Sequence, residues 1–285
     1  MAKTLYSEAR ISRDMSLWQT LILGGVQGLT EFLPISSSGH LIFIPKFFGW
    51  ADQGLAFDVV VHVGTLMAVV VYFRKRLLVL VRNFRLSRSR GSLAMTDENR
   101  AGWFVILSVI PAALTGFFFG DWIEDSARSA WVVGVSLITW AVVLAAADRL
   151  SLKHKNIKTL KQITWKDMIF ISCVQAIALI PGTSRSGITM TAGLLSRLDK
   201  TSAVEFSFLM AVPVIALAGM YELVQIIRHD VAIAQFSNLI IGFFAAAVSG
   251  FVAIWALMKI IQRWSFMPFV VYRVVIGVAI LVYLT

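Results

Sequence analysis

The stretch LPISSSGHLIF, residues 33–43, interrupts a sequence that is otherwise strongly apolar. Proline lacks the backbone N–H that a continuous helix needs, while serine and glycine favour helix caps and turns. The apolar segment before it, residues 17–32, would form a helix about 24 Å long, which is too short to cross a bilayer core of about 30 Å. We therefore predict that residues 33–43 contain the loop of a re-entrant helix-loop-helix hairpin.

The rest of the composition is that of a membrane protein. Of the 285 residues, 58% are hydrophobic, and the mean hydropathy is +0.78. Six apolar runs are long enough for transmembrane helices, near residues 57–73, 103–120, 130–147, 203–225, 237–258 and 267–285. We predict an all-α polytopic membrane protein with six transmembrane helices plus re-entrant hairpins, forming a single membrane domain over residues 1–285.

The distribution of charge indicates how the chain is oriented. The formal net charge of +10 lies mostly between the spans, so it does not indicate a nucleic-acid partner. Lysine and arginine are concentrated in the linkers 74–102 and 149–166, whereas the connection 121–130 is acidic. The positive-inside rule then predicts that both basic linkers are cytoplasmic and that both termini are outside.

The chain contains an internal repeat. Residues 26–39, VQGLTEFLPISSSG, align without gaps with residues 174–187, VQAIALIPGTSRSG. The second copy also breaks a short apolar segment, and three spans separate the copies, so the two hairpins would enter the membrane from opposite sides. We predict an inverted-topology repeat of about residues 17–148 and 166–285, whose broken helices meet near the middle of the bilayer.

Two polar residues precede the first loop on one helix face. Gln27 and Glu31 are four residues apart, so both point toward the serine loop. An ionised glutamate in a membrane segment costs at least about 2.5 kcal/mol and needs a cation or a polar cavity. The alternative is a carboxylate that lies in the interfacial layer of the bilayer.

The first loop has the composition of an anion site. Its hydroxyls and the unpaired N–H groups of the helix that follows are the groups that bind phosphate oxygens. The alternative is that the serines only cap this helix and that the histidine is packed. The residues concerned are Ser36, Ser37, Ser38, Gly39 and His40.

The second loop adds a permanent cation. Arg185 lies among Thr183, Ser184, Ser186 and Gly187, and its planar guanidinium suits phosphate oxygens. A structural ion pair with the glutamate of the first hairpin is the alternative role. In the alignment Arg185 corresponds to the middle serine of the first loop, so a two-fold axis would bring these two side chains face to face.

Four further ionisable residues lie in or beside predicted spans. Glu205 and Arg273 either enter the cavity or pair with each other. Asp58 and His62 lie one helical turn apart at the start of a span, and we interpret them as interfacial.

The segments QGLTEFLP, SSSGH and PGTSRSG resemble the motifs of the undecaprenyl-diphosphate phosphatases of the bacitracin-resistance type, and the resemblance extends along essentially the whole chain. It implies hydrolysis of undecaprenyl diphosphate to undecaprenyl phosphate and phosphate, which recycles the lipid carrier for cell-wall synthesis. It also implies a bacterial plasma (inner) membrane, with the cavity facing the periplasm or outside, and Mg²⁺ or Ca²⁺ as a helper with Glu31 as a metal ligand. Gln27 stands where many members have glutamate, which removes one candidate ligand.

Combined with the needs of diphosphate chemistry, these motifs suggest roles for the residues. We assign Ser37 as nucleophile, His40 as general base or acid, Arg185 as phosphate clamp, and Glu31 with Gln27 to metal or water positioning. Ser36 and His40 are alternative nucleophiles. The expected substrate-binding residues are Gln27, Ser36, Ser38, Gly39, Thr183, Ser184, Ser186, Gly187, Glu205 and Arg273.

A transporter or lipid flippase is the competing function. Inverted repeats with broken helices are typical of secondary transporters, and an anion carrier would also use a buried arginine. The combination of serine, histidine and arginine favours the enzyme, because a carrier does not need a nucleophile. The expected partners are a polyprenyl diphosphate lipid and membrane lipid, and a homodimer is compatible with the sequence.

Overall fold

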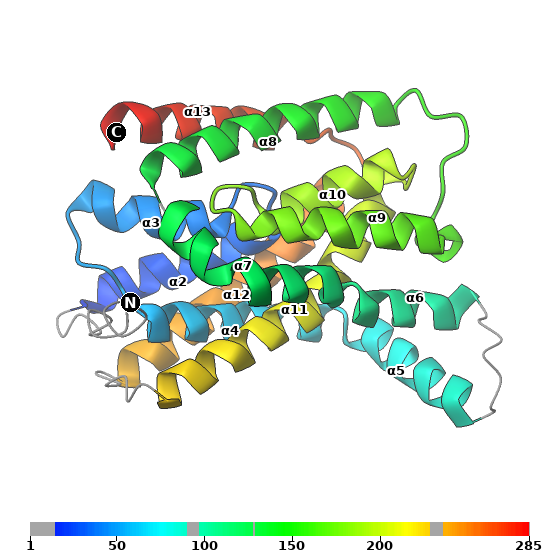
Figure 1. The fold of residues 1–285 in the computed structure, drawn as a ribbon, viewed down its shortest axis with the longest axis horizontal. Helices are drawn as coiled ribbons and strands as arrows, with labels where there is room; N and C mark the ends of the chain where they lie inside the picture. Colours follow the sequence, from blue (N-terminus) through cyan, green and yellow to red (C-terminus); the bar gives the residue numbers. More distant parts are fainter. Residues whose placement is uncertain (1–14, 90–96, 128, 229–235, 285) are drawn as a thin grey trace.

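The computed structural model describes residues 15–89, 97–127, 129–228 and 236–284. Within these ranges the ordered elements are helices, with two short 3₁₀ turns, η1 (Leu160–Gln162) and η2 (Ile177–Leu179) (Figure 1). The described ranges contain no strand and only one isolated β-bridge, between Lys158 and Leu198. The all-α prediction is therefore confirmed for this part of the chain.

Among the described residues, five helices are long and apolar enough to cross a bilayer. One of them, Arg100–Gly120, consists of parts of two consecutive helices, α6 (Asp97–Leu107) and α7 (Val109–Ala127). The other four are α4 (Leu55–Tyr72), α8 (Ala130–Ser151), α11 (Lys200–Arg228) and α12 (Phe236–Ile260). The sixth predicted span corresponds to α13 (Met267–Tyr283), an apolar helix of 17 residues. The chain is thus a helical, multi-pass membrane protein.

Two pairs of short helices lie where the hairpins were predicted. The first pair is α2 (Leu17–Phe32) and α3 (Ser37–Phe48), and the second is α9 (Trp165–Ala176) and α10 (Arg185–Leu195). Ser36 and Ser184 cap α3 and α10 with left-handed φ angles of 75° and 70°, and each side chain accepts a hydrogen bond from the glycine N–H three residues later. The two copies of the repeat therefore fold into the same turn.

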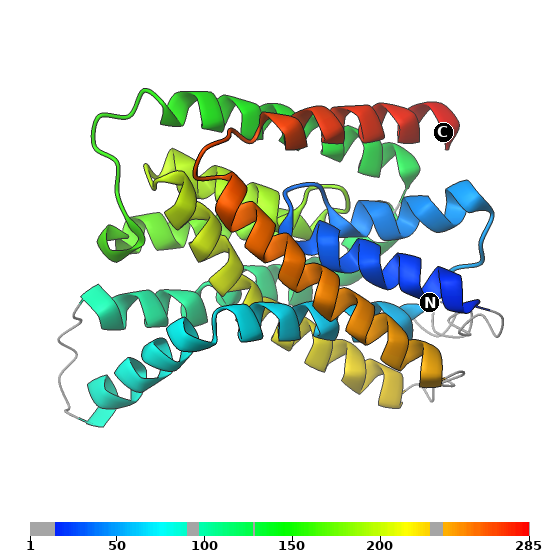
Figure 2. The ribbon, with the colours of Figure 1, turned by 180° about the vertical axis from the view of Figure 1, so that it is seen from behind.

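The two hairpin loops lie against each other in the middle of the molecule (Figures 1 and 2). Ser186 Oγ in the second hairpin donates a hydrogen bond of 3.0 Å to the backbone carbonyl of Leu33 in the first. This contact joins the two halves of the chain at their loops.

Helix packing around the first hairpin depends on small residues. A Cβ atom on Gly28 of α2 would lie 2.0 Å from Ser249 Oγ and 2.4 Å from the Ala246 carbonyl oxygen, both on α12. A Cβ atom on Gly64 of α4 would lie 2.5 Å from the carbonyl oxygen of Phe243, also on α12. Small residues at such crossings let helix backbones approach closely, as is common in membrane proteins. Both α2 and α4 therefore pack tightly against α12.

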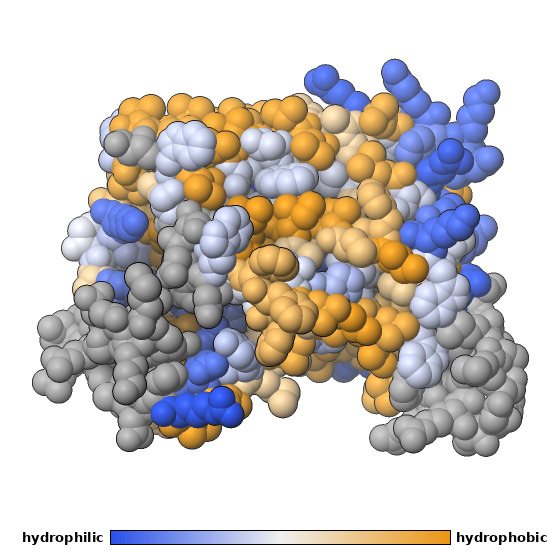
Figure 3. Space-filling model, in the orientation of Figure 1, coloured by the Kyte–Doolittle hydropathy of each residue, from blue (hydrophilic) through white to orange (hydrophobic). Residues whose placement is uncertain are grey.

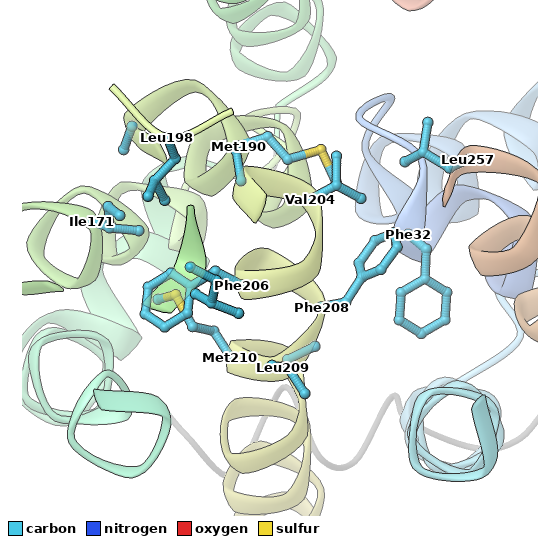
Figure 4. Close-up of a cluster of buried hydrophobic side chains, with 14 of the residues drawn as sticks. Phe32, Ile171, Met190, Leu198, Val204, Phe206, Phe208, Leu209, Met210 and Leu257 are labelled. Carbon is cyan, nitrogen blue, oxygen red and sulfur yellow. The ribbon is translucent and has the colours of Figure 1, made fainter. Parts of the chain in front are cut away.

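A large hydrophobic cluster supports the end of α2 (Figure 4). Phe32 meets Phe208 of α11 edge to face, with ring centroids 5.3 Å apart. Phe206 and Phe208 are both buried, and Ser207 lies between them in the sequence. The cluster fixes the end of α2 relative to the middle of α11, which are the two elements beside the candidate site.

The exterior has an apolar surface and a polar end (Figure 3). Large apolar side chains such as Phe117, Phe118 and Val248 are exposed, as expected for a surface in contact with lipid. The ends of α5 (Arg74–Ser89) and α8 lie at the same end of the molecule, where Arg100 donates to the carbonyl of Lys161 at 3.2 Å (Figure 1). The start of α2 and the end of α13 lie at the opposite end.

Candidate active site

The two hairpins meet at the carboxylate of Glu31, in the last turn of α2. This side chain is 8% exposed. Its Oε1 accepts a hydrogen bond from Arg185 Nη2 at 2.8 Å, and its Oε2 accepts from Ser37 Oγ at 2.7 Å and from Gln27 Nε2 at 3.2 Å. One carboxylate therefore connects a hydroxyl of the first loop with the cation of the second.

The serines of the first loop have different environments. Ser36 is buried, and its Oγ accepts from the N–H of Gly39 at 3.4 Å and lies 3.3 Å from Ser38 Oγ. Ser37 is the first residue of α3, is only partly buried, and directs its Oγ to the Glu31 carboxylate. Ser36 thus shapes the turn, and Ser37 presents a hydroxyl to a proton acceptor at the positive end of a helix.

Arg185 is held at the N-terminus of α10 by contacts from two other helices. Its Nη1 donates to the carbonyl of Ser207 on α11 at 2.9 Å, and its Nη2 donates to Glu31 on α2. The ion pair foreseen as the structural alternative is therefore present. Because a guanidinium has five N–H groups, these two contacts leave donors with which to bind phosphate oxygens.

The two ring nitrogens of His40 have partners other than Ser37. Its Nδ1 lies 2.6 Å from the carbonyl oxygen of Ser36, and its Nε2 lies 2.7 Å from the hydroxyl of Tyr272 on α13. Both ring nitrogens are thus occupied by other partners, which differs from the expectation that His40 acts directly on the nucleophile as general base or acid. The sequence could not show this, because Tyr272 is far from the loop along the chain.

Two polar side chains of the second loop make structural contacts, one within the loop and one to the first hairpin. Ser184 Oγ accepts from the N–H of Gly187 at 3.1 Å, and Ser186 Oγ is directed to the first hairpin. Thr183 is fully buried, and its Oγ1 has no hydrogen-bond partner in the structure. The structure therefore places Thr183, Ser184, Ser186 and Gly187 beside the cluster, with the hydroxyls of Ser184 and Ser186 in structural contacts.

Arg273 and Glu205 lie apart from the Glu31 cluster. Arg273 is fully buried and donates to four backbone carbonyls, those of Pro34 in the first loop, Leu137, and Gly182 and Thr183 in the second loop. Glu205 pairs instead with Arg76, at an N–O distance of 3.3 Å. The two residues were expected to enter the cavity or to pair with each other. Arg273 acts on the loop backbones, and Glu205 joins α11 to α5.

Sequence reasoning missed two residues at the site. His62, interpreted above as interfacial, has its Nε2 3.9 Å from Glu31 Oε2, while its Nδ1 lies 2.7 Å from the Asp58 carbonyl. Tyr272 belongs to none of the motifs described above. Its only signal in the sequence is that it precedes the buried Arg273.

The site offers few ligands for a metal ion. Within the described ranges, no group of three His, Cys, Asp or Glu side chains is placed to hold one. Two oxygen-bearing groups are available at the cluster, the Glu31 carboxylate and the buried Oε1 of Gln27, which has no hydrogen-bond partner among the described residues. Mg²⁺ commonly uses one or two carboxylates together with phosphate oxygens of the substrate. The residues therefore fit an ion that a phosphate ligand helps to hold, and they do not form a complete site.

The arrangement as a whole suits phosphoryl transfer. The Ser37 hydroxyl donates a hydrogen bond to one oxygen of the Glu31 carboxylate, and the Arg185 guanidinium donates to the other. Two helices, α3 and α10, begin at the loops. These parts correspond to a nucleophile, a proton acceptor and a charge clamp.

Comparison with known proteins gives consistent matches over nearly the full length. Residues 20–279 match the family described as bacitracin resistance protein BacA. Undecaprenyl-diphosphatase 1 of Pseudoalteromonas translucida is 46% identical over 271 residues, which cover 95% of this chain and 100% of the relative. The undecaprenyl-diphosphatase of Thioalkalivibrio sulfidiphilus is 44% identical over 270 residues, covering 94% and 98% of the two chains. Undecaprenyl-diphosphatase 2 of Stutzerimonas stutzeri is 42% identical over 268 residues, again covering 94% and 98%.

Proposed function

Because the chain belongs to the bacitracin resistance protein BacA family, we propose that it is an undecaprenyl-diphosphatase, which hydrolyses undecaprenyl diphosphate to undecaprenyl phosphate and inorganic phosphate. This reaction recycles the lipid carrier of cell-wall synthesis. The supporting structural observation is that Ser37 and Arg185 are bonded to the same carboxylate, that of Glu31. The transport alternative is not favoured, since the relatives named above are all diphosphatases and a carrier does not need a serine bonded to a carboxylate.

In the first step, the Oγ atom of Ser37 attacks the terminal phosphorus of the substrate. Its proton passes to Glu31 Oε2, which already accepts that hydrogen bond at 2.7 Å. A new bond forms between Oγ and phosphorus, while the bond from phosphorus to the bridging oxygen breaks. Undecaprenyl phosphate leaves with the electron pair of that bond and takes the proton from Glu31, so the carboxylate is ionised again and a phosphoserine remains on the enzyme.

In the second step, water hydrolyses the phosphoserine. Glu31 orients the water, accepts one of its protons and returns a proton to Ser37 Oγ as phosphate is released. Arg185 binds the phosphoryl oxygens in both steps, and the N-termini of α3 and α10 add backbone N–H groups to this anion site. The protein thus supplies positioning and charge, which dominate catalysis of phosphoryl transfer.

A divalent cation, Mg²⁺ or Ca²⁺, would assist this chemistry by neutralising charge on the diphosphate. Glu31 and the unpartnered Oε1 of Gln27 are the residues that would hold it, together with oxygens of the substrate. Asp or Glu at position 27 would strengthen such a site, because a carboxylate is a better ligand than an amide.

The proposed arrangement in the membrane has six spans, with α13 as the last, and two re-entrant hairpins related by an inverted repeat. Three spans lie between the hairpins, so α2–α3 would insert from outside and α9–α10 from the cytoplasm. The basic linkers would face the cytoplasm of the bacterial inner membrane, and the site would open toward the periplasm. The polyprenyl tail of the substrate would remain in the lipid.

Trapping the phosphoenzyme tests this mechanism. Purified protein mixed with substrate labelled in the terminal phosphate and denatured at neutral pH should carry label on Ser37, as identified by mass spectrometry of peptides. Ser37→Ala should carry no label and release no phosphate, whereas Ser237→Ala, at an exposed position on α12, should carry label and release phosphate. Label on His40 or Ser36 would overturn the assignment of the nucleophile.

A further inference from the structure

The turn before Ser37 differs from its equivalent in the second repeat in one hydrogen bond. Ser36 and Ser184 have nearly the same backbone angles, with φ of 75° and 70° and ψ of 99° and 105°. In the second copy, the N–H of Ile188 donates to the Ser184 carbonyl at 2.9 Å, as in an ordinary first helical turn. In the first copy, the corresponding bond from His40 to the Ser36 carbonyl is stretched to 3.4 Å. The Ser36 carbonyl is therefore held differently.

The imidazole of His40 forms a second, shorter hydrogen bond to the Ser36 carbonyl. Its Nδ1 lies 2.6 Å from the Ser36 carbonyl oxygen, which can only accept a hydrogen bond, so Nδ1 must carry the proton. Nε2 then accepts from the hydroxyl of Tyr272 at 2.7 Å. The two rings are also nearly parallel, with an interplanar angle of 5° and centroids 5.6 Å apart. The Ser36 carbonyl thus fixes the tautomer of His40, and Tyr272 holds the ring in its plane.

This geometry connects α13 to the nucleophile by way of the backbone. A left-handed φ at a serine is strained and persists only where the surroundings enforce it. The residue that follows Ser36 is Ser37, so the orientation of the Ser36 peptide sets the direction of the Ser37 hydroxyl. Arg273, which follows Tyr272 on α13, holds the Pro34 carbonyl of the same loop.

We propose that Tyr272 and His40 form a positioning pair, in which Tyr272 orients His40 and His40 holds the Ser36 carbonyl so that the Ser37 hydroxyl points at Glu31. His40 is then a positioning residue and not the general base. The inference rests on the proposed role of Ser37 as nucleophile and adds Tyr272 to the residues that determine the turnover rate.

Two substitutions at position 40 separate positioning from base catalysis. The side-chain amide of Asn can replace Nδ1–H as a donor to the Ser36 carbonyl, but it cannot accept a proton at neutral pH. We expect His40→Asn to retain kcat within about 10-fold of wild type, the range for one altered hydrogen bond. His40→Ala should lose about 10²-fold or more, because the turn is no longer held. The pH dependence of kcat should be the same in His40→Asn and in wild type.

A general base at position 40 gives a different result, with losses of about 10²-fold or more in both variants and a changed pH profile. That result, in variants that remain monodisperse in detergent, would overturn the proposal. If His40→Ala does not fold, the kcat and pH profile of His40→Asn decide between the two roles. Ser37→Ala, assayed for phosphate release in parallel, tests the nucleophile separately, so failure of that assignment is distinguishable.

Tyr272→Phe tests the other member of the pair. The phenyl ring keeps the stacking but loses the hydrogen bond to Nε2, so we expect kcat to fall about 3- to 10-fold with KM unchanged. Tyr283→Phe is the matched control, because Tyr283 lies on the same helix, is 72% exposed and should retain full activity. An unchanged kcat in Tyr272→Phe would remove Tyr272 from the proposal, and a change in KM alone would indicate substrate binding instead of positioning.

Discussion

Arg273, which is buried, and Arg185, which is partly buried, lie at the meeting point of the hairpins and differ in the partners of their nitrogens. Arg273 donates to four backbone carbonyls, which leaves it suited to a structural role. Arg185 makes one contact with a carbonyl and one with the Glu31 carboxylate, and the remaining donors can bind an anion. Arginine therefore has a structural role at position 273, whereas at position 185 it has donors left with which to bind an anion.

Replacing Arg185 by lysine should reduce activity and leave the fold intact. Lysine keeps the charge, but its ammonium group cannot bind Glu31, Ser207 and a phosphate in one planar arrangement. We expect kcat to fall about 10²-fold or more, the range for loss of a group that stabilises transition-state charge. Steady-state phosphate release in detergent measures the effect.

Two further arginine variants test whether the loss of activity is specific to position 185. Arg74→Lys, at an exposed position, should have normal activity and stability. Arg273→Lys should lower the melting temperature, because several buried carbonyls would lose their donors. Equal activity in Arg185→Lys and wild type would contradict the role of Arg185 as a clamp.

Much of the Glu31 cluster could be predicted from the sequence. Helical spacing placed Gln27 and Glu31 on one face, and the repeat placed Ser37 opposite Arg185. The partners of His40 could not be predicted, because Tyr272 is in the last helix and no local pattern connects it to the loop. His62 was missed for a similar reason, since its position relative to Glu31 depends on how α4 packs against α2.

At the scale of elements, the hairpins depend on close helix approach. Hydropathy and the prolines in the loops indicated where α2 and α9 end, because these are local properties. In contrast, the part of α12 that packs against α2 depends on the side-chain volumes of two segments that lie far apart in the sequence. Gly28 permits this contact, with α12 atoms closer than a Cβ atom would tolerate.

Gly28→Ala should therefore destabilise the protein. The added methyl group would lie 2.4 Å from the Ala246 carbonyl, so α2 must move away from α12 at a cost of about 1–3 kcal/mol. Thermal unfolding in detergent should show a lower melting temperature. Because Glu31 is on the same helix, kcat should fall as well.

Gly25→Ala is the matched control for this prediction. It lies on the same helix, and a Cβ atom there would have no neighbour within 4 Å. Alanine is the better helix former, so the control should be as stable as wild type or more stable. A similar loss of stability in both variants would show that tight packing at Gly28 is not the cause.

At the scale of the whole molecule, the described parts of the two basic linkers lie at one end, and the start of α2 and the end of α13 lie at the other (Figure 1). The positive-inside rule predicted this grouping, since it depends only on the number of spans and the linker charges. Among the described residues, five helices satisfy both length and hydropathy criteria, whereas α13 is shorter, so composition alone does not define its depth. The packing of α13 against α8 has to supply that information, and it was not evident in the sequence.

Cysteine labelling tests the proposed orientation. Cys173 is the only cysteine, so a Cys173→Ser background leaves a single reporter thiol in each variant. In spheroplasts, a membrane-impermeant maleimide should label Ala51→Cys, in the exposed loop between α3 and α4. Lys155→Cys, in the exposed loop between α8 and α9, should react only after the membrane is permeabilised. The reverse pattern would invert the orientation, and labelling of both sites from outside would contradict the number of spans.

Arg273 binds the carbonyls of both hairpin loops, yet it lies in the last helix of the chain. A ribosome makes the protein from its N-terminus, so both loops are synthesised before Arg273, which supports them in addition to their direct contacts. The loops therefore gain the support of Arg273 only after α13 has entered the membrane. Hydrolysis of a lipid diphosphate at a fully supported site would therefore have to wait for the insertion of α13.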